Sequence, residues 1–287
     1  MVRGWTLSLL CGATLVWGAG STDAAVLRSA VERGPAPRLE RPSNTTGAAL
    51  DELLELSGLR AQLGALALGI RAELQELRAG IDARDRVEMD RIAARHFDPE
   101  MLYTRVRLEL GRRVDRAKLG AALAWYRSPL GRRITRHEVA AISAERSGTP
   151  LPSDERLAQV QELDERGGAS ETTLDVAMTL VRSLARSSAP LRPAHLRLTS
   201  NQLEERISLA RIQAITPIRI ACLQHMLFAY RELTDVEVAE YVRFVESPAG
   251  QWYVEAMDRA LVDAAGVAAE LTAVELVTLV PHLTESR

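Results

Sequence analysis

Histidines come first among residues able to do chemistry, because two of them one helical turn apart, with an adjacent glutamate, bind zinc in metalloproteases. The segment His137-Glu138-Val139-Ala140-Ala141 begins in this way, but Ala141 occupies the position of the second ligand. The five histidines are scattered through the sequence, at His96, His137, His195, His225 and His282. We therefore expect no metal site.

Other catalytic patterns are equally incomplete. Ser128 and Ser247 each precede a proline, which favours a helix-capping role over a nucleophilic one. The sequence contains no nucleophile elbow and no glycine-rich phosphate loop. Carboxylates are plentiful, and two that converge in space could act as general acid and base. We expect no catalytic residue and no cofactor, with an envelope hydrolase that uses convergent carboxylates as the alternative.

An internal repeat is the strongest structural signal. The segment Trp125–Ile134 returns without a gap as Phe244–Tyr253, and the aromatic, the Ser-Pro pair and the glycine recur in place. Each serine can end one helix and cap the next, with proline in the first position, where its missing N–H costs nothing. Glycine in a first turn costs ~1 kcal/mol against alanine, so we infer a close helix approach that a Cβ would block. The residues predicted to be structural are Ser128, Pro129, Gly131, Ser247, Pro248 and Gly250.

The helix before each Ser-Pro pair has a start signal. Thr234 and Glu237 form the pattern of a capping box, in which each side chain satisfies a backbone N–H of the other. In the first copy Asp115 takes the cap position, but Lys118 stands where the glutamate would be. Thr234 and Glu237 are therefore also predicted to be structural.

These elements belong to an all-α chain. Apolar residues recur at three- and four-residue steps from Ala48 onward, and no alternating strand pattern is present. The predicted helices lie near 70–79, 84–95, 99–112, 115–127, 129–145, 154–165, 170–187, 200–213, 216–231, 234–246, 248–268 and 270–281. We predict two similar multi-helix units in tandem without a β-sheet, at 48–146 and 156–287, joined by a linker at 147–155. Whether they form one body or two stays open.

The N-terminus has a secretory pattern. A short positive start precedes an apolar stretch from Trp5 to about Ala19 and a run of small residues. We interpret residues 1–24 as a signal peptide, removed near Ser21 or Ala24, and residues 25–47 as a flexible tether. The apolar stretch is shorter than the ~20 residues that span a bilayer, so we expect a periplasmic chain without a transmembrane span.

Charge is unevenly distributed between the two copies. The net charge of −2 gives no general attraction to nucleic acid. The first copy is basic, whereas equivalent positions in the second are acidic: Arg116 aligns with Asp235, Lys118 with Glu237 and Arg127 with Glu246. Either these are two solvated faces, or the copies meet about a pseudo-twofold axis with complementary charges.

The basic cluster also suggests a binding surface. Arginines near an aromatic pair could contact an anionic lipid headgroup or the acidic surface of an envelope protein. The residues predicted for this surface are Arg113, Arg127, Arg132 and Arg133. A further alternative is a carrier of an apolar ligand, which requires a closed cavity between helices. We expect a non-catalytic interaction or structural module.

The repeated motif resembles a bacterial exported family known as domain of unknown function 2059. The similar features are a Thr-x-x-Glu helix start, an aromatic residue and Ser-Pro-x-Gly. Leu233–Tyr253 matches well, and the first copy matches through Trp125–Gly131 but departs at its cap. The resemblance covers about 40 residues in each half and implies two tandem copies in an α-helical envelope protein, with no established activity.

Overall fold

The computed structural model describes residues 44–76, 83–144, 151–189 and 197–285, and within these ranges every regular element is an α-helix. The predicted all-α class is confirmed. The helices are α1 (Asn44–Leu56), α2 (Leu59–Glu76), α3 (Ala83–His96), α4 (Pro99–Arg112), α5 (Arg116–Arg127), α6 (Pro129–Ser143), α7 (Asp154–Gly167), α8 (Ala169–Ser188), α9 (Ser200–Ala229), α10 (Asp235–Glu246) and α11 (Pro248–Glu285). The predicted signal peptide lies outside the described residues.

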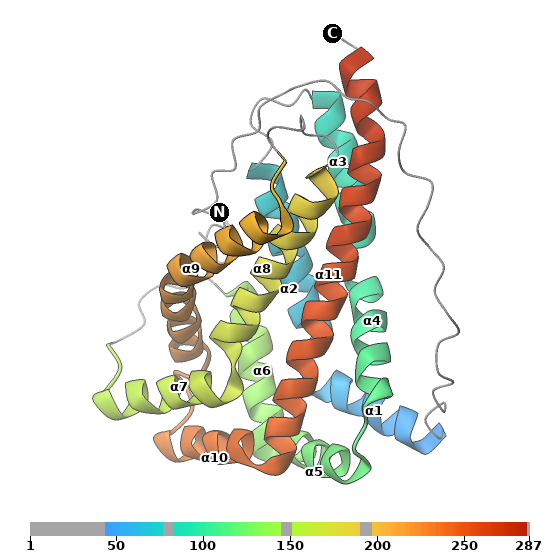
Figure 1. Cartoon of the computed structure of the whole chain (residues 1–287). Helices are drawn as coiled ribbons and strands as arrows, with labels where there is room; N and C mark the ends of the chain where they lie inside the picture. Colours follow the sequence, from blue (N-terminus) through green and yellow to red (C-terminus); the bar gives the residue numbers. More distant parts are fainter. Residues whose placement is uncertain (1–43, 77–82, 145–150, 190–196, 286–287) are drawn as a thin grey trace.

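The long helix α11 runs through most of the height of the molecule (Figure 1) and packs against α8, α4, α3 and α5. Ala260, Ala264 and Ala268 repeat every four residues along it and are almost fully buried. Small side chains on one face of a helix let neighbouring helices approach closely, which explains how a chain with 4% aromatic residues fills its centre.

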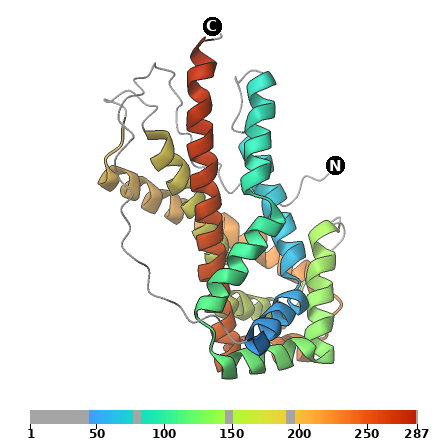
Figure 2. The ribbon, with the colours of Figure 1, turned by 90° about the vertical axis from the view of Figure 1, so that its right-hand side faces the viewer.

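The two predicted units share this core. The main hydrophobic cluster combines Leu53 of α1, Leu102 of α4 and Leu123 of α5 with Met257 and the α11 alanines. Seen from the side, α11 stands beside the helices of the first unit (Figure 2). The question left open by the sequence is therefore answered by packing, because residues from both sides of the predicted linker 147–155 are buried together.

Two smaller clusters complete the interior. One joins Ile134 of α6 and Val160 of α7 to the apolar stripe of α10, which consists of Val238, Val242 and Val245. The other lies between α8 and α9. Together with the main cluster they place α5, α6, α10 and the start of α11, the four helices of the repeat, at one end of the molecule (Figure 1).

Several predicted helix limits are wrong. The tether was predicted to reach residue 47, but α1 begins at Asn44; residues 25–43 lie outside the described ranges. Residues 154–155 of the linker belong to α7. The predicted interruption near residue 214 is absent from α9, which continues through Pro217, and the one at 269 is absent from α11. Between α1 and α2, Gly58 has a left-handed φ of 71°, a conformation that glycine adopts readily and that ends α1.

Candidate functional site

The two Ser-Pro-x-Gly segments form the same corner. The Oγ of Ser128 accepts a hydrogen bond of 3.0 Å from the backbone N–H of Gly131, and Ser247 accepts one of 3.1 Å from Gly250. Each serine is both the last cap of one helix and the first cap of the next, and each proline stands in the first turn. The capping role predicted for these serines is confirmed.

Each corner glycine lies against the backbone of the preceding helix. A Cβ added to Gly131 would be 2.3 Å from the carbonyl oxygen of Trp125, and one added to Gly250 would be 2.1 Å from that of Phe244. No side chain fits at such distances without a backbone shift. The close approach inferred from the sequence is therefore confirmed at both corners.

The helix starts before the corners also agree with the sequence. The Oγ1 of Thr234 accepts from the backbone N–H of Glu237 at 3.3 Å, and the Glu237 carboxylate accepts from the backbone N–H of Thr234 at 2.8 Å. In the first copy, the carboxylate of Asp115 accepts from Ala117 and Lys118. The hydrogen bond from Thr234 lowers the pKa of the Glu237 carboxyl. Glu237 is thus an anion next to α6.

The two corners face each other through their aromatic residues. The rings of Trp125 and Phe244, which are equivalent in the repeat, stack with centroids 4.5 Å apart and planes 6° apart. Tyr126 meets the edge of Phe244, and Trp125 also lies over Tyr241. Contact between equivalent residues is the arrangement expected at a pseudo-twofold axis.

A partly buried carboxyl group lies beside these rings. One oxygen of Glu138 on α6 accepts hydrogen bonds from the hydroxyl of Tyr230 at 2.7 Å and from that of Tyr241 at 3.1 Å. Removal from water raises the pKa of Glu138, and the two hydroxyl donors partly oppose that shift. Burial likewise raises the pKa of Tyr230 and Tyr241, and that of Tyr253 to about 12. Burial therefore favours the neutral form of each of these groups.

An open groove lies on the outer side of the same helix, between α6 and the turn that joins α9 to α10. Its volume is about 480 Å³. Its lining combines cations, small residues and one carboxylate: Arg133, Arg136, His137, Ala140, Ala141, Ala144, Arg231 and Glu232. We call it the arginine groove. It is a candidate binding site formed by described residues.

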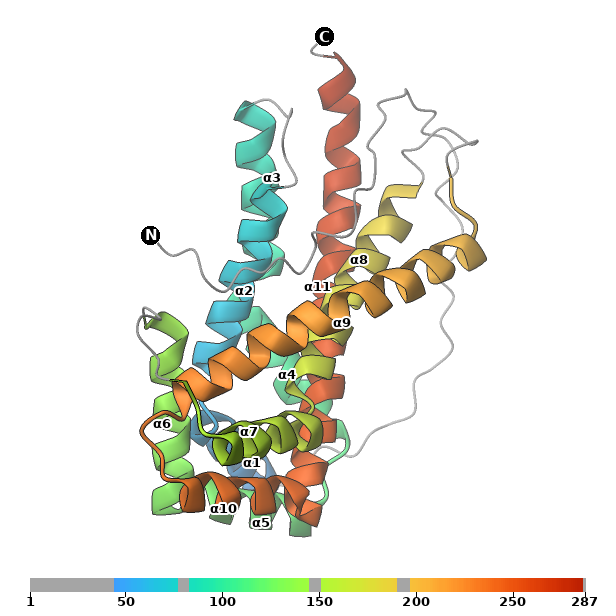
Figure 3. The same cartoon turned by 90° about the vertical axis from the view of Figure 1, so that its left-hand side faces the viewer.

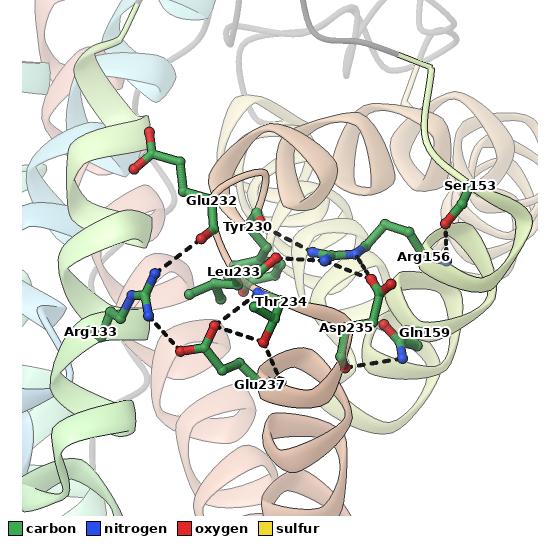
Figure 4. Close-up of polar contacts among 10 residues, drawn as sticks. All are labelled: Arg133, Ser153, Arg156, Gln159, Tyr230, Glu232, Leu233, Thr234, Asp235 and Glu237. Atoms are coloured by element: carbon green, nitrogen blue, oxygen red, sulfur yellow. Dashed lines mark hydrogen bonds and ion pairs between the residues drawn. The ribbon is translucent and has the colours of Figure 1, made fainter.

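The groove arginines are only partly neutralised. Arg133 lies 2.5 Å from the Glu237 carboxylate and donates to the backbone oxygen of Glu232 at 3.1 Å (Figure 4). Arg231 lies over the ring of Phe228 at 4.2 Å and 3.3 Å from the Glu232 carboxylate. Arg136 is exposed and forms no ion pair with any residue in the described ranges. A guanidinium has five N–H donors, so all three arginines keep donors for a ligand.

The turn that carries Arg231 is held from both sides. Figure 4 shows Arg133 and Arg156 reaching it from opposite directions. Arg156 of α7 donates to the Asp235 carboxylate at 2.7 Å and to the backbone oxygens of Tyr230 and Leu233 at 2.9 and 2.6 Å. Three donated bonds from one half-buried guanidinium fix the turn relative to α7, and with it one wall of the groove.

The binding surface predicted from the sequence is divided in the structure. Arg127 forms a two-bond pair with Glu52, at 2.7 and 2.6 Å, and the charge of the exposed Arg132 also lowers the pKa of Glu52. Arg113 ends α4, on the far side of the 12-residue helix α5, about 18 Å long. Only Arg133 lines the groove. The groove therefore includes only one of the four arginines, and the surface predicted for Arg113, Arg127, Arg132 and Arg133 together stays a prediction.

The charge complementarity predicted between aligned positions is also wrong. Arg127 pairs with Glu52, and Glu246 pairs with Arg166 of α7 at 3.2 Å. Lys118 lies 4.0 Å from Asp115 in its own helix. One contact that crosses between the copies is Arg133–Glu237, in which Glu237 meets an arginine of α6 in place of its aligned residue Lys118 on α5.

The sequence pattern did not identify the residues that define the site. Tyr230 and Arg231 come from the turn between α9 and α10, and Tyr241 comes from α10. Their positions depend on packing between elements about 100 residues apart, as the Glu138 contacts show. His137 had been considered as a zinc ligand; it lines the groove instead. Within the described ranges, no three His, Cys, Asp or Glu side chains form a group that could hold a metal ion.

None of the described helices alone combines the length and apolar character needed to cross a bilayer, whereas α1 and α2 together, bent by 61°, have enough length and apolar character. Comparisons with protein-family models, curated proteins and solved structures find no match to this chain, so its resemblance to the family called domain of unknown function 2059 stays a prediction.

Proposed function

We propose that this chain is an exported, non-catalytic interaction module of the bacterial cell envelope, and that the arginine groove binds an anionic group of its partner. One observation carries the proposal: the guanidinium groups of Arg133, Arg136 and Arg231, from two elements far apart in the sequence, line a single open groove. Exposed arginines scattered over a surface would not indicate a binding site.

The chemistry of the groove supports an oxyanion as the bound group. Arginine offers a planar fork of donors that matches carboxylate and phosphate oxygens. Arg156 and Arg133 hold the turn in place before any ligand arrives, which reduces the ordering cost of binding. Glu232 shares the groove, so a ligand must compete with its carboxylate for Arg231. The source of the oxyanion is either a lipid headgroup or an acidic protein surface.

The hydrolase alternative has less support. Acid–base catalysis by carboxylates needs two that converge, whereas the polar neighbours of the Glu138 carboxyl are tyrosine hydroxyls. Export rests on the secretory pattern of residues 1–24 and on the family resemblance. Export and anion binding at the arginine groove can therefore be tested independently.

Capture from envelope extract tests the proposal. The tagged mature chain is compared with Arg136→Glu, which reverses the exposed charge in the groove, and with Arg113→Glu, which makes the same change at the exposed end of α4. We expect proteins or lipids that wild type and Arg113→Glu retain and Arg136→Glu loses. Identical captured material with all three chains would remove the groove from consideration.

A further inference from the structure

Helix α9 has apolar residues on two opposite faces. Its inner face buries Leu203, Ile207 and Ile218 against α8. Its outer face exposes Leu209, Ile212 and Ile220, of which 55%, 70% and 52% of the surface is accessible. A helix in a folded protein normally has a polar face toward solvent, and a helix apolar on both sides is normally covered on both. Figure 3 shows α9 on the outside of the molecule.

The outer face has the composition of an interface. Between Arg206 and Arg219, about 20 Å along the helix axis, the exposed positions Ser208, Leu209, Ile212, Gln213, Thr216 and Pro217 carry no charge. The charged side chains on this side stand at the two ends. Apolar residues at the centre with charges at the rim is the usual anatomy of a protein–protein contact.

The order of residues along this face indicates which partner fits it. Glu205 lies seven residues before Ile212, and Arg219 lies seven residues after it. If a second α9 lies antiparallel to the first about a twofold axis at Ile212, each Glu205 faces the Arg219 of the other copy. Leu209 then faces Ile215, Ser208 faces Thr216, and the two Ile212 side chains meet. A self-complementary patch of this kind is what a twofold contact between identical chains requires.

The charged residues are available for such a contact. Glu205 is exposed and forms no ion pair with any residue in the described ranges. Arg219 is 48% exposed, and its atoms lie 3.8 Å from the Asp164 carboxylate and 4.0 Å from that of Glu171, at the outer limit of ion pairing. The inner-face arginine, Arg211, instead donates to Glu171 at 2.7 Å.

We propose that the chain forms a homodimer through the outer face of α9, with the two helices antiparallel about Ile212 and Glu205 paired with Arg219 of the other copy. One helix pair is a small interface, so the dissociation constant falls in the range of about 1–100 µM. This inference does not depend on the arginine groove, which lies beyond the other end of α9.

Sedimentation of the full chain over a concentration series tests the proposal. We expect a mass that rises toward twice that of one chain, and Ile212→Glu to weaken association at least tenfold, since a carboxylate would be placed against its own copy. Glu205→Arg and Arg219→Glu should each weaken association, because each sets like charges opposite one another. The double variant Glu205→Arg/Arg219→Glu should restore it, because both pairs are reversed.

The rescue separates the interface from damage to the fold. Arg219→Glu also removes the contact with Asp164, but a chain misfolded for that reason would not recover when Glu205 is changed. Glu162→Arg, an equal charge reversal on the exposed side of α7, should leave association unchanged. A chain that remains monomeric at about 100 µM, a dimer insensitive to Ile212→Glu, or a monomer that binds anionic vesicles through α9 would overturn the proposal.

Discussion

Trp125 and Phe244 stack face to face, 4.5 Å apart, although they hold the same position in two copies of one sequence motif. The repeat therefore does more than place two corners in the chain: it brings them into contact. Each corner contributes its aromatic residue to the other, and the shared core around α11 joins the remaining helices of both units.

A double-mutant cycle measures this contact. We expect Trp125→Ala and Phe244→Ala together to cost less than the sum of their separate effects, with a coupling of about 0.5–1.5 kcal/mol typical of paired rings. The measurement is the free energy of unfolding in denaturant. Trp125→Ala combined with Leu203→Ala, which lies in the separate cluster between α8 and α9, should be additive; equal coupling in both cycles would contradict a direct contact.

The corner glycines should not tolerate a methyl group. Gly131→Ala and Gly250→Ala each place a Cβ within 2.3 Å of a backbone oxygen, so each should reduce the free energy of unfolding by about 1–3 kcal/mol or more. Gly120→Ala in α5 is the matched control, because its Cβ meets nothing within 4 Å. That change should instead stabilise the helix, by up to about 1 kcal/mol. The same sign at all three positions would refute the close approach.

The sequence predicted these corners because their causes are local. A serine cap, a proline without an N–H and a glycine without a Cβ act within one turn of the chain, and so do the caps Thr234 and Asp115. The same reasoning failed at Pro217. There Ile218 is buried against α8, and its packing outweighs the lost hydrogen bond and keeps α9 continuous.

The site could not be predicted in the same way. Arg133, Arg136 and His137 were visible as a basic run on one helix, but Arg231 and Tyr230 reach that helix only because α7, α9 and α10 pack beside it. The four arginines named from the sequence were chosen by charge. Nearby carboxylates decide which of them forms an ion pair within the protein. Glu52 engages Arg127, and Glu237 engages Arg133.

Glu138 should make stability depend on pH in the direction opposite to the paired carboxylates. Because burial raises its folded pKa above the ordinary value of 4.5, the folded state holds this proton more tightly than the unfolded state. Its contribution to the free energy of unfolding is therefore complete below about pH 4.5. That contribution is lost as the pH rises through the raised pKa of the folded state. Glu237, whose pKa is lowered, contributes stability above pH 4.5 that is lost on acidification.

Comparison of wild type with Glu138→Gln isolates this effect. Glutamine keeps an acceptor for Tyr230 and Tyr241 but cannot ionise. The stability of the variant relative to wild type should rise with pH from about pH 4.5 and then level off. Tyr230→Phe should leave the start of the rise unchanged and extend it to higher pH before it levels off, because it removes a donor that favours the ionised form. A difference that is constant from pH 4 to pH 8 would show that Glu138 titrates normally.

Arg156 should matter more than its place outside the groove suggests. Arg156→Ala leaves the backbone oxygen of Leu233 without its donor and removes one of the two donors to that of Tyr230, so we expect a loss of about 1–3 kcal/mol in the free energy of unfolding. Arg259→Ala removes an exposed pair with Glu255 within α11 and should change stability little. If the two variants were equally stable, the turn would not depend on Arg156.

The central claim is that the arginine groove binds an oxyanion, and backbone amide NMR during titration with sodium sulfate at low ionic strength tests it most directly. We expect saturable shifts at residues 133–141 of α6 and at Arg231 and Glu232, abolished in Arg136→Glu and preserved in Arg113→Glu. Sodium chloride at matched ionic strength should not reproduce them. Shifts that follow ionic strength alone, or that concentrate around Arg113 or Arg127, would contradict the assignment of the groove as the binding site.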